Sequence, residues 1–428
     1  MSYYFRWQAG GVMGHSGAPA RIRMAKLIHA KACAPYFIIC LRVAIAIGFV
    51  GPITFVASMA AATRANELYP APFWQCRVAT ESALFVSEDQ RPAFARLMFR
   101  PIGPVSIQRE GASGPSAVFF VEGRDYVTDR TARRVTLMQH GTVPFVQQSE
   151  LRVPANRAAS FLRSKDVAGQ ALFLSEDGFF NREQVTISYR HRRDRWPGSA
   201  PEFTSSGLPR TIARLRSTNP VKIMLVGDSI SEGYNASAHL KMAPMRPPYA
   251  DQVVAGLRVA YHNDVTLTNR AHAGWKSSQG LAQVTNESLD DARPDLIVIA
   301  FGMNDAAEVS AIDFAKNVAA IMAAFRRKNP DSEYILVSPM LPNPNWAFVS
   351  DQRYVEYRNA LRVMQKRGVM VADMTSLWTA ILSRKSFYDI TGNGVNHPND
   401  FGHSLYAQTI LAMLVPPNRI RRLTSFKC

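Results

Sequence analysis

The sequence predicts an α/β fold preceded by an all-β region, and three features of the 428-residue chain support this prediction. Residues 67–205 alternate short apolar runs with turns rich in Gly, Asp and Pro, which is typical of β-strands. Residues 221–415 alternate wholly apolar, strand-like runs with helical patterns, which indicates a parallel sheet covered by helices on both faces. Between them, residues 195–210 (RWPGSAPEFTSSGLPR) have the Pro, Gly and Ser content of a linker.

The first 65 residues have the pattern of a leader. A basic segment ends at Arg42, and an apolar stretch follows at residues 43–62 (VAIAIGFVGPITFVASMAAA), ending in small residues that permit Ala-x-Ala cleavage at 60–62. This is the pattern of a secretory signal peptide. An uncleaved signal anchor is the alternative, because about 20 apolar residues are near the length that spans a bilayer. Either leader predicts a secreted protein or one of the periplasm or cell envelope, and only an uncleaved leader would hold it in the membrane.

Composition and charge limit the function classes. With 47% hydrophobic and 19% charged residues, the chain is globular rather than disordered. Its formal net charge is +17, but residues 1–66 contain seven Lys and Arg and no Asp or Glu, which leaves +10 for the rest. Because the basic residues are not interleaved with aromatic ones, we expect a solvated basic surface and no nucleic-acid partner.

The cysteines and histidines predict no metal site. Cys33 and Cys40 lie in the leader, so Cys76 and Cys428 remain after cleavage, and the sequence leaves open whether these two are bridged. No Cys and His spacing resembles that of a zinc site. We therefore expect an activity that needs neither a metal nor another cofactor.

Residues 66–205 are expected to form an all-β accessory domain of the sandwich or jelly-roll type. Residues 122–138 (EGRDYVTDRTARRVTLM) have the pattern of a β-hairpin. The main apolar runs are, in order, FARLMF (94–99), AVFFVEG (117–123), RRVTLM (133–138) and QVTISYRH (184–191).

In the second region, predicted strands and helices alternate. Wholly apolar strands of this kind belong in a sheet that is buried on both faces. The predicted strands are 221–226, 265–269, 296–301, 334–338 and 369–373, and the helices include 249–262 (YADQVVAGLRVAYH) and 312–328 (IDFAKNVAAIMAAFRRK).

Chemically distinctive residues follow these strands. The first predicted strand ends in Ser229, the second leads to Gly274 and the third to Asn304, while His397 lies just before the last helix. Sites in open α/β sheets gather outside the carboxyl ends of the strands. Taken singly, each residue has an ordinary role in a turn or a helix cap. Together they supply a serine nucleophile with a histidine base, and N–H donors for a developing oxyanion, so the set predicts acyl transfer.

Four motifs that contain these residues, GDSIS, AHAGW, GMND and VNHPND, resemble those of the SGNH (GDSL-type) hydrolases in order and spacing. The resemblance implies a flavodoxin-like three-layer α/β/α fold, with Ser229 as nucleophile and His397 as base. It also implies an oxyanion hole formed by the Ser229 N–H, the Gly274 N–H and the Asn304 side chain. A preceding β-domain is similar to the arrangement in some bacterial carbohydrate esterases. The expected division is a leader (1–65), an all-β accessory domain (66–205) and an SGNH hydrolase catalytic domain (206–428).

The chain departs from this family at the acid of the catalytic triad. The family usually has an acidic residue three positions before the histidine, and this position is Gly394. Two interpretations stay open: a Ser–His dyad whose histidine is oriented by a backbone carbonyl, or Asp389, eight residues before His397, as the acid. Asp400 is expected to cap the last helix, and Asp228 to be a structural turn residue.

The expected substrate is an acylated saccharide or another small ester. Trp275 and Trp346 are expected at the rim of the site, where flat rings stack on sugar faces, and Asn235, Asn343 and Asn345 suit hydroxylated groups. The prediction is a secreted serine esterase that removes acyl groups, above all acetyl, from a saccharide or glycan. The alternatives are a lysophospholipase or thioesterase, a polysaccharide O-acetyltransferase, and, from another class, a non-catalytic cell-surface glycan-binding protein.

Overall fold

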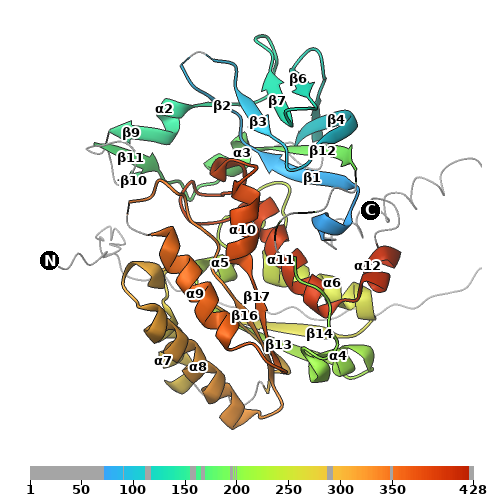
Figure 1. Ribbon diagram of the computed structural model, residues 1–428, viewed down its shortest axis with the longest axis vertical. Coiled ribbons are helices and arrows are strands. Elements are labelled where there is room, and N and C mark those ends of the chain that lie inside the picture. Colours follow the sequence, from blue (N-terminus) through green and yellow to red (C-terminus); the bar gives the residue numbers. More distant parts are fainter. Residues whose placement is uncertain are drawn as a thin grey trace, which may run out of the picture. The chain divides into compact units, whose positions relative to one another are not determined.

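The computed structural model is shown in Figure 1. It describes residues 72–423 apart from residues 90, 111–116, 155–160, 165–168, 193–195, 197, 199, 287–292 and 348–349. All described residues belong to one compact unit of the chain. The leader at 1–65 lies outside the described residues, so the signal peptide and the signal anchor stay predictions.

Five parallel strands form the central sheet of the α/β region. Their order across the sheet is β14-β13-β15-β16-β17, which is the flavodoxin-like arrangement. Every residue of β15 and β16 is buried, as expected for parallel strands covered on both faces. The sequence prediction of these five strands is confirmed, with each end within one residue. The strands are β13 (Val221–Gly227), β14 (Val265–Asn269), β15 (Leu296–Ala300), β16 (Glu333–Val337) and β17 (Val369–Ala372).

Helices cover both faces of this sheet (Figure 1). On one face α8 packs against α7 and α9, and on the other α6 packs against α11 and α12. The predicted three-layer α/β/α fold is therefore confirmed. The helices are α4 (Pro209–Arg216), α5 (Ser229–Glu232), α6 (Tyr249–Tyr261), α7 (Ser277–Asn286), α8 (Ala311–Lys328), α9 (Asp351–Val363), α10 (Met374–Leu382), α11 (Asp400–Leu414) and α12 (Pro417–Leu423), with the 3-10 turns η2 (Asp305–Ala307) and η3 (Phe387–Asp389).

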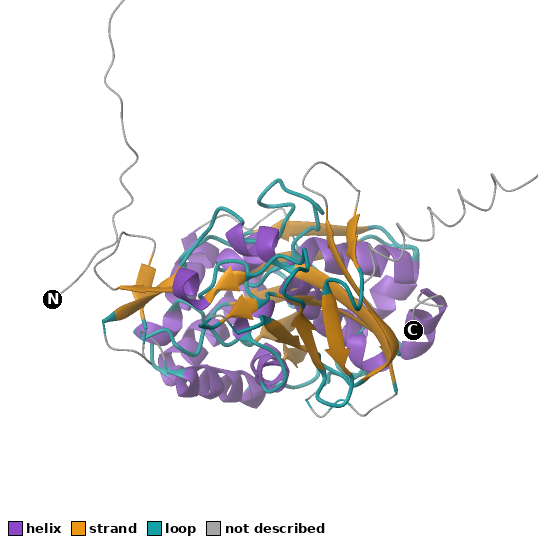
Figure 2. Ribbon diagram, turned by 90° about the horizontal axis from the view of Figure 1, so that it is seen from above, coloured by secondary structure: helices purple, strands orange, loops and turns teal. Residues whose placement is uncertain are grey.

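The region before the α/β region is strand-rich, as predicted, and contains three sheets (Figure 2). Their orders are β1-β12-β4-β5, β6-β7-β3-β2-β8 and β10-β11-β9. The predicted hairpin is present as β6 paired antiparallel with β7. The strands are β1 (Val78–Ala83), β2 (Val86–Ser87), β3 (Phe94–Arg96), β4 (Pro101–Glu110), β5 (Ala117–Phe120), β6 (Tyr126–Asp129), β7 (Arg134–Leu137), β8 (Val146–Gln147), β9 (Arg152–Pro154), β10 (Phe161–Arg163), β11 (Gln170–Phe173) and β12 (Val185–His191). Short helical turns accompany them: η1 (Phe73–Gln75), α2 (Gln148–Leu151) and α3 (Phe179–Glu183).

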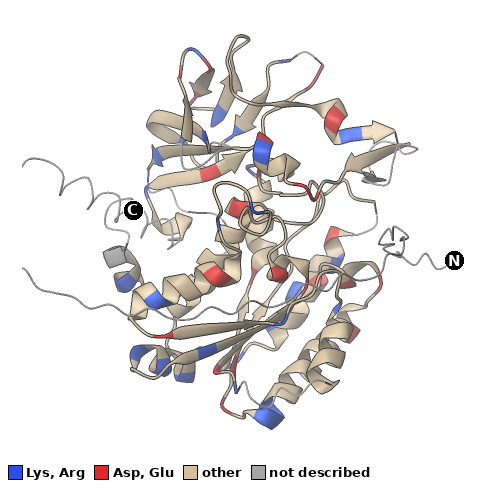
Figure 3. Ribbon diagram, turned by 180° about the vertical axis from the view of Figure 1, so that it is seen from behind, with Lys and Arg blue, Asp and Glu red and all other residues tan. Residues whose placement is uncertain are grey.

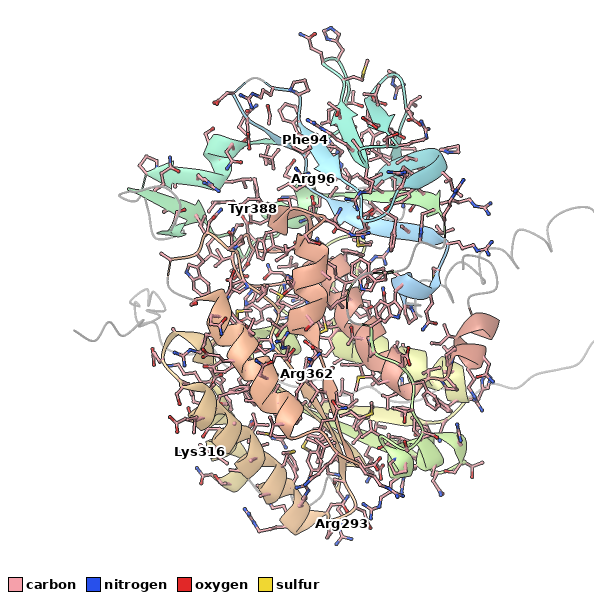
Figure 4. All side chains as sticks on the ribbon, in the orientation of Figure 1. Phe94, Arg96, Arg293, Lys316, Arg362 and Tyr388 are labelled. Carbon is pink, nitrogen blue, oxygen red and sulfur yellow. The ribbon has the colours of Figure 1, made fainter. Side chains whose placement is uncertain are left out.

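Buried charges join the strand-rich region to the α/β region. Lys385, between α10 and η3, is fully buried, and its Nζ lies 2.8 Å from Glu81 of β1 and 3.6 Å from Asp389. Lys385 also donates to the backbone carbonyl of Arg96 at 3.1 Å. Figure 4 labels Arg96 in the strand-rich region and Tyr388 at the junction. Because a buried ammonium group requires such partners, and because the hydrophobic core is also continuous, the two regions share one interior. The domain boundary at 205/206 stays a prediction.

The distribution of charged residues and the character of the helices concern possible nucleic-acid and membrane partners. Lys and Arg are interspersed with Asp and Glu over both regions (Figure 3). In the part of the chain that the structure describes, no helix combines the length and the apolar character needed to cross a bilayer.

Cys76, which follows η1, is buried and disulfide-bonded. The other three cysteines, Cys33, Cys40 and Cys428, all lie outside the described residues. The partner of Cys76 therefore lies outside them too, and the Cys76–Cys428 bridge stays an open alternative.

Candidate active site

The turn after β13 presents Ser229 at the carboxyl edge of the sheet. Asp228 caps α5, and its Oδ1 accepts a hydrogen bond from the backbone N–H of Ile230 at 3.1 Å. Gly227 permits close packing here, because a Cβ at this position would lie 2.7 Å from the carbonyl oxygen of Ala300. Asp228 is thus the structural turn residue that we expected, and the Ser229 hydroxyl is not used as a cap.

The Ser229 hydroxyl instead contacts His397. The distance from Ser229 Oγ to His397 Nε2 is 2.9 Å, and the two side chains are almost fully buried. The other ring nitrogen, Nδ1, faces two acceptors: Asn235 Oδ1 at 2.7 Å and the Glu176 carboxylate at 3.3 Å. Because Nδ1 donates its proton to these acceptors, Nε2 is free to accept the proton of the serine hydroxyl.

Neither interpretation of the sequence describes the group that orients His397. Its Nδ1 contacts side chains rather than a backbone carbonyl. The Asp389 carboxylate accepts hydrogen bonds from the backbone N–H groups of Leu84 and Ser386, both at 2.9 Å, and pairs with Lys385. Asp389 therefore anchors β1 to the α/β region. The assignment of Asp389 as the acid is wrong, because its carboxylate is already occupied in this buried cluster.

Asp400 does not cap the last helix. The cap of α11 is Asn399, which accepts from the backbone N–H of Gly402 at 2.9 Å. Asp400 is the first helical residue, and its Oδ1 accepts from the backbone N–H of Ser237 at 2.7 Å. The prediction was one residue too late, because the asparagine before Asp400 has an equally good capping side chain.

Residues 390–399, called the histidine loop below, are held in place by buried asparagines. Oδ1 of Asn393 accepts the backbone N–H groups of residues 395, 396 and 397 at 2.9 to 3.0 Å. Asn343 donates to a backbone carbonyl of this loop at 2.8 Å, and Asn235 to another at 3.3 Å. Asn235 and Asn343 are each only 1% exposed, so the expectation that they bind substrate is wrong. Asn345 is partly exposed, and its role stays a prediction.

Hydrogen bonds bring the expected oxyanion donors to the Ser229 turn. After β14, the backbone N–H of His272 donates to the carbonyl of Gly227 at 3.1 Å, and that of Ala273 donates to Glu232 at 2.6 Å. These two bonds fix the loop that contains Gly274 beside the nucleophile turn. An oxyanion donor must be held in position before the reaction, and this loop meets that requirement.

The N–H groups that we expect to bind the oxyanion are free to donate to a ligand. Gly274 has a φ of +77°, a left-handed conformation that favours glycine, and a Cβ at this position would meet nothing within 4 Å. Among the described residues, the backbone N–H groups of Ser229 and Gly274 have no hydrogen-bond acceptor. Asn304 Nδ2 donates to the carbonyl of Trp275 at 3.0 Å, and its second N–H is available. The arrangement can therefore stabilise an oxyanion.

An aromatic pair flanks Gly274 in the sequence. The ring of Trp275 lies 4.1 Å from the exposed ring of His272, with their planes 33° apart. Trp275 and Trp346 are both partly buried and pack against the hydrophobic core. The Trp275 pair thus borders the open donors, in the place where the sequence predicts a rim.

Asp228, the residue before Ser229, has a strongly shifted pKa. Burial raises the pKa of Asp228 to about 7, the charge of Asp305 adds to this shift, and the hydrogen bond from Ile230 opposes it. Burial also raises the pKa of Asp305, although hydrogen bonds from Ser277 oppose the shift. Neither carboxylate contacts His397, so both have a structural role.

The one carboxylate that contacts His397 among the described residues, that of Glu176, was not identified from the sequence. Glu176 lies 221 residues before the histidine, on the loop between β11 and α3. The glycine at position 394 was the one signal that an acid had to come from elsewhere, and it does not indicate from where.

A serine held against a histidine at the edge of a parallel α/β sheet, with open N–H donors beside them, is an arrangement that suits ester hydrolysis. Residues 225–405 match the profile of the GDSL-like Lipase/Acylhydrolase family, and this span includes both the Ser229 turn and the histidine loop. This part of the chain therefore has the sequence pattern of the GDSL (SGNH) family, as its motifs predicted.

Solved structures with a similar fold include three enzymes. A two-domain esterase active on acetylated mannans has 20% identity and a TM-score of 0.41, over 53% of this chain and 56% of that one. A lipase from a goat rumen metagenome has 16% identity and a TM-score of 0.38, over 46% and 99%. A catalytic variant of an acetylxylan esterase from Geobacillus stearothermophilus has 16% identity and a TM-score of 0.37, over 48% and 96%. The match thus spans little more than half of the two-domain esterase. No curated protein matches the sequence.

Proposed function

We propose that this protein is a serine esterase that removes short acyl groups, in the first place acetyl, from a saccharide or glycan, with Ser229 as nucleophile and His397 as base. The observation that carries this proposal is the contact of 2.9 Å between Ser229 Oγ and His397 Nε2, next to open N–H donors. A serine hydroxyl becomes a competent nucleophile when an adjacent base accepts its proton in this way.

The reaction follows from the arrangement of these groups. Ser229 Oγ attacks the carbonyl carbon of the ester while His397 Nε2 takes up the hydroxyl proton. The N–H groups of Ser229 and Gly274 and the Asn304 amide donate hydrogen bonds to the oxyanion that forms. The imidazolium then gives its proton to the leaving sugar oxygen, and an acyl-serine remains. Water, deprotonated by His397, attacks this acyl-serine through the same kind of intermediate. The bond between the acyl carbon and Ser229 Oγ then breaks, His397 returns the proton to Oγ, and the acid is released.

The surroundings of the site support a short acyl group. Among the described residues, the exposed large apolar side chains lie elsewhere, and none belongs to the Ser229 turn, the Gly274 loop or the histidine loop. A long acyl chain would need apolar surface to leave water, since each buried methylene contributes about 0.8 kcal/mol. The flat rings of His272 and Trp275 suit a sugar face next to Gly274.

Ester hydrolysis by purified wild-type protein and Ser229→Ala tests this proposal. The substrates are p-nitrophenyl acetate, butyrate and palmitate, followed by acetylated mannan and acetylated xylan. We expect the acetate ester to be cleaved fastest, and Ser229→Ala to lose nearly all turnover while keeping its thermal stability, because replacing serine by alanine here removes little packing. Ser278→Ala, an exposed serine on α7, is the matched control and should resemble the wild type.

Wild-type turnover by Ser229→Ala would contradict the proposal. A preference for the palmitate ester would instead favour a lysophospholipase, and binding of glycans without hydrolysis of any ester would favour a non-catalytic binding protein.

We also propose that residues 1–65 direct export, because a basic segment followed by an apolar stretch and small residues is the pattern of a signal peptide. Mass spectrometry of the exported protein should find a start near Thr63 or Asn66. An intact N-terminus in the membrane fraction would support the signal anchor instead.

A further inference from the structure

We propose that Glu176, which the strand-rich region supplies, is the anionic positioning residue of His397, so that the Ser–His pair of the α/β region is completed by the other region. This inference rests on the proposed function, in which Ser229 and His397 act as nucleophile and base. The strand-rich region would then contribute a residue that supports catalysis, and its role would not be limited to binding.

The geometry of Glu176 supports a direct role. Both carboxylate oxygens lie 3.3 Å from His397 Nδ1, and Oε1 also accepts a hydrogen bond from Asn393 Nδ2 at 2.9 Å. Burial raises the pKa of Glu176, but the hydrogen bond and the charge of His397, together with Asn393 and Asn235, outweigh burial and leave the pKa below its usual value. Glu176 is therefore ionised at neutral pH, as a partner of an imidazolium must be.

The other titratable groups around His397 do not offer an anion. The ring of Tyr234 lies edge-on at 5.4 Å, and burial raises the pKa of Tyr234, so this phenol is neutral. His403 of α11 is buried, and burial lowers its pKa to about 4, so it is neutral as well. The ring of His239 contacts the ring of Tyr234 in a tilted arrangement, with the ring centroids 4.8 Å apart. Glu176 is thus the source of negative charge at His397 among the described residues.

The strand-rich region also explains why the usual position of the acid is empty. Gly394 has a φ of +83°, and a Cβ at this position would lie 2.6 Å from the carbonyl oxygen of Phe173 and 2.5 Å from the ring of Phe180. Both contacts come from residues 173–184, called the docking segment below, and Glu176 belongs to the same segment. The segment that fills the space for a side chain at position 394 therefore brings another carboxylate to the same histidine.

Hydrogen bonds hold the docking segment on both flanks of the histidine loop. The backbone N–H of Ser175 donates to the carbonyl of Asn393 at 3.2 Å, and Asn181 Nδ2 donates to the carbonyl of Asn235 at 3.2 Å. The buried Gln184 donates to the carbonyls of Tyr388 and Thr391, both at 2.8 Å. Glu176 is therefore placed by backbone contacts, although 43% of its side chain is exposed.

Glu176 and Asn235 have different effects on His397. Asn235 Oδ1 is neutral and closer, at 2.7 Å, so it holds the tautomer with the proton on Nδ1. Glu176 adds a charge that stabilises the imidazolium formed during the reaction. Loss of the charge alone should therefore lower the rate less than the factor of about 10⁴ that the serine-protease example shows when the orienting aspartate becomes an asparagine.

Glu176→Gln tests this inference, because it keeps the shape and removes the charge. With p-nitrophenyl acetate we expect kcat to fall about 10- to 100-fold, the range for one charge-assisted hydrogen bond, while KM changes little. The acid limb of the kcat/KM profile should move to lower pH, because a neighbouring anion favours the protonated form of a base and the variant lacks that anion. The matched control is Glu356→Gln on α9, a glutamate of similar exposure that pairs with Arg353 at 3.7 Å, and it should keep wild-type kinetics.

A charge-transfer variant separates a positioning role from a structural one. In Glu176→Gln combined with Asn235→Asp, the carboxylate moves to the side chain that already bonds Nδ1, so the net charge beside His397 is that of the wild type. We expect this double variant to recover most of the lost rate and to move the acid limb back. A purely structural effect of Glu176 would not be repaired in this way.

Two results would overturn the inference. One is an unchanged kcat and an unchanged acid limb in Glu176→Gln. The other, in a double variant that keeps the thermal stability of the wild type although an aspartate at position 235 cannot donate to the Gly392 carbonyl, is a rate loss that the Asn235→Asp exchange leaves uncorrected at every pH. In both cases, an inactive Ser229→Ala would leave the proposed function standing. An active Ser229→Ala would remove the proposed function together with this inference.

Discussion

Gly394→Asp places an acid at the position where the family usually carries it, and we expect it to destabilise the protein without restoring catalysis. A residue other than glycine at a φ of +83° is strained by about 1–2 kcal/mol. Its Cβ would also lie 2.6 Å from the carbonyl oxygen of Phe173, which belongs to backbone and cannot rotate away. Overpacking of a filled interior costs about 1–3 kcal/mol. The expected loss in the free energy of unfolding is therefore about 2–5 kcal/mol.

Urea denaturation followed by tryptophan fluorescence measures this loss, and two variants divide it into its parts. Gly394→Ala has the same backbone strain and the same Cβ contact but no carboxylate, so it should lose nearly as much stability. Gly368→Ala has a similar φ of +80°, but its nearest neighbour would be 3.8 Å away, so it should lose only the strain of about 1–2 kcal/mol.

The same variant tests whether the position can still supply the acid. Gly394→Asp should not raise the activity of Glu176→Gln, because the docking segment occupies the space that the carboxylate would need. Wild-type stability of Gly394→Asp, or recovery of the Glu176→Gln rate, would refute the view that the strand-rich region excludes an acid at this position.

Two other variants test the oxyanion hole and the acid behind the nucleophile. Asn304→Ala should lower kcat by about 10²–10³, the usual cost of one oxyanion donor, with a smaller change in KM; an effect on KM alone would make Asn304 a substrate-binding residue. Asp228→Asn should gain stability relative to the wild type as the pH rises. The pKa of Asp228 is about 7 when folded, against a usual value of 3.8, so below pH 4 both states hold the proton and the pKa shift does not change the free energy of unfolding. Between pH 4 and 7 only the unfolded state loses its proton, which destabilises the wild-type fold by about 1.4 kcal/mol per pH unit. Asparagine keeps the helix cap and does not titrate. If urea titrations gave a difference in the free energy of unfolding between Asp228→Asn and the wild type that is independent of pH, this reasoning would be wrong.

Short-range patterns in the sequence were enough to predict the sheet and the contact between the two side chains that we propose to react. A parallel strand that is buried on both faces must be apolar throughout, so the run at 221–226 identifies β13 without any knowledge of its neighbours. The end of such a strand lies at the edge where sites form, which directs attention to Ser229 and, through the motif spacing, to His397. The confirmed hairpin of β6 and β7 is likewise a local feature.

Buried polar residues were predicted less well, because the sequence does not show which partner satisfies them. Asn235 and Asn343 were expected to face substrate, and both are buried against carbonyl groups of the histidine loop. Asp389 was a candidate acid on the basis of its distance along the chain from His397, but it is bonded to Leu84 of the strand-rich region. A carboxylate or an amide can satisfy its hydrogen bonds with any group nearby in space, and only the fold decides which groups are near.

By itself, the sequence determined the class of fold and the residues at the strand ends, because each depends on periodicity or on a motif within a short segment, and four such motifs resemble those of the GDSL (SGNH) family. The tertiary structure alone decided what orients His397. Glu176 reaches Nδ1 from 221 residues away, because the docking segment is packed onto the histidine loop and takes up the space beside Gly394. The sequence does show that the usual acid is missing. Its replacement depends on how two regions pack against each other, and packing between distant segments leaves no periodic signal in either of them.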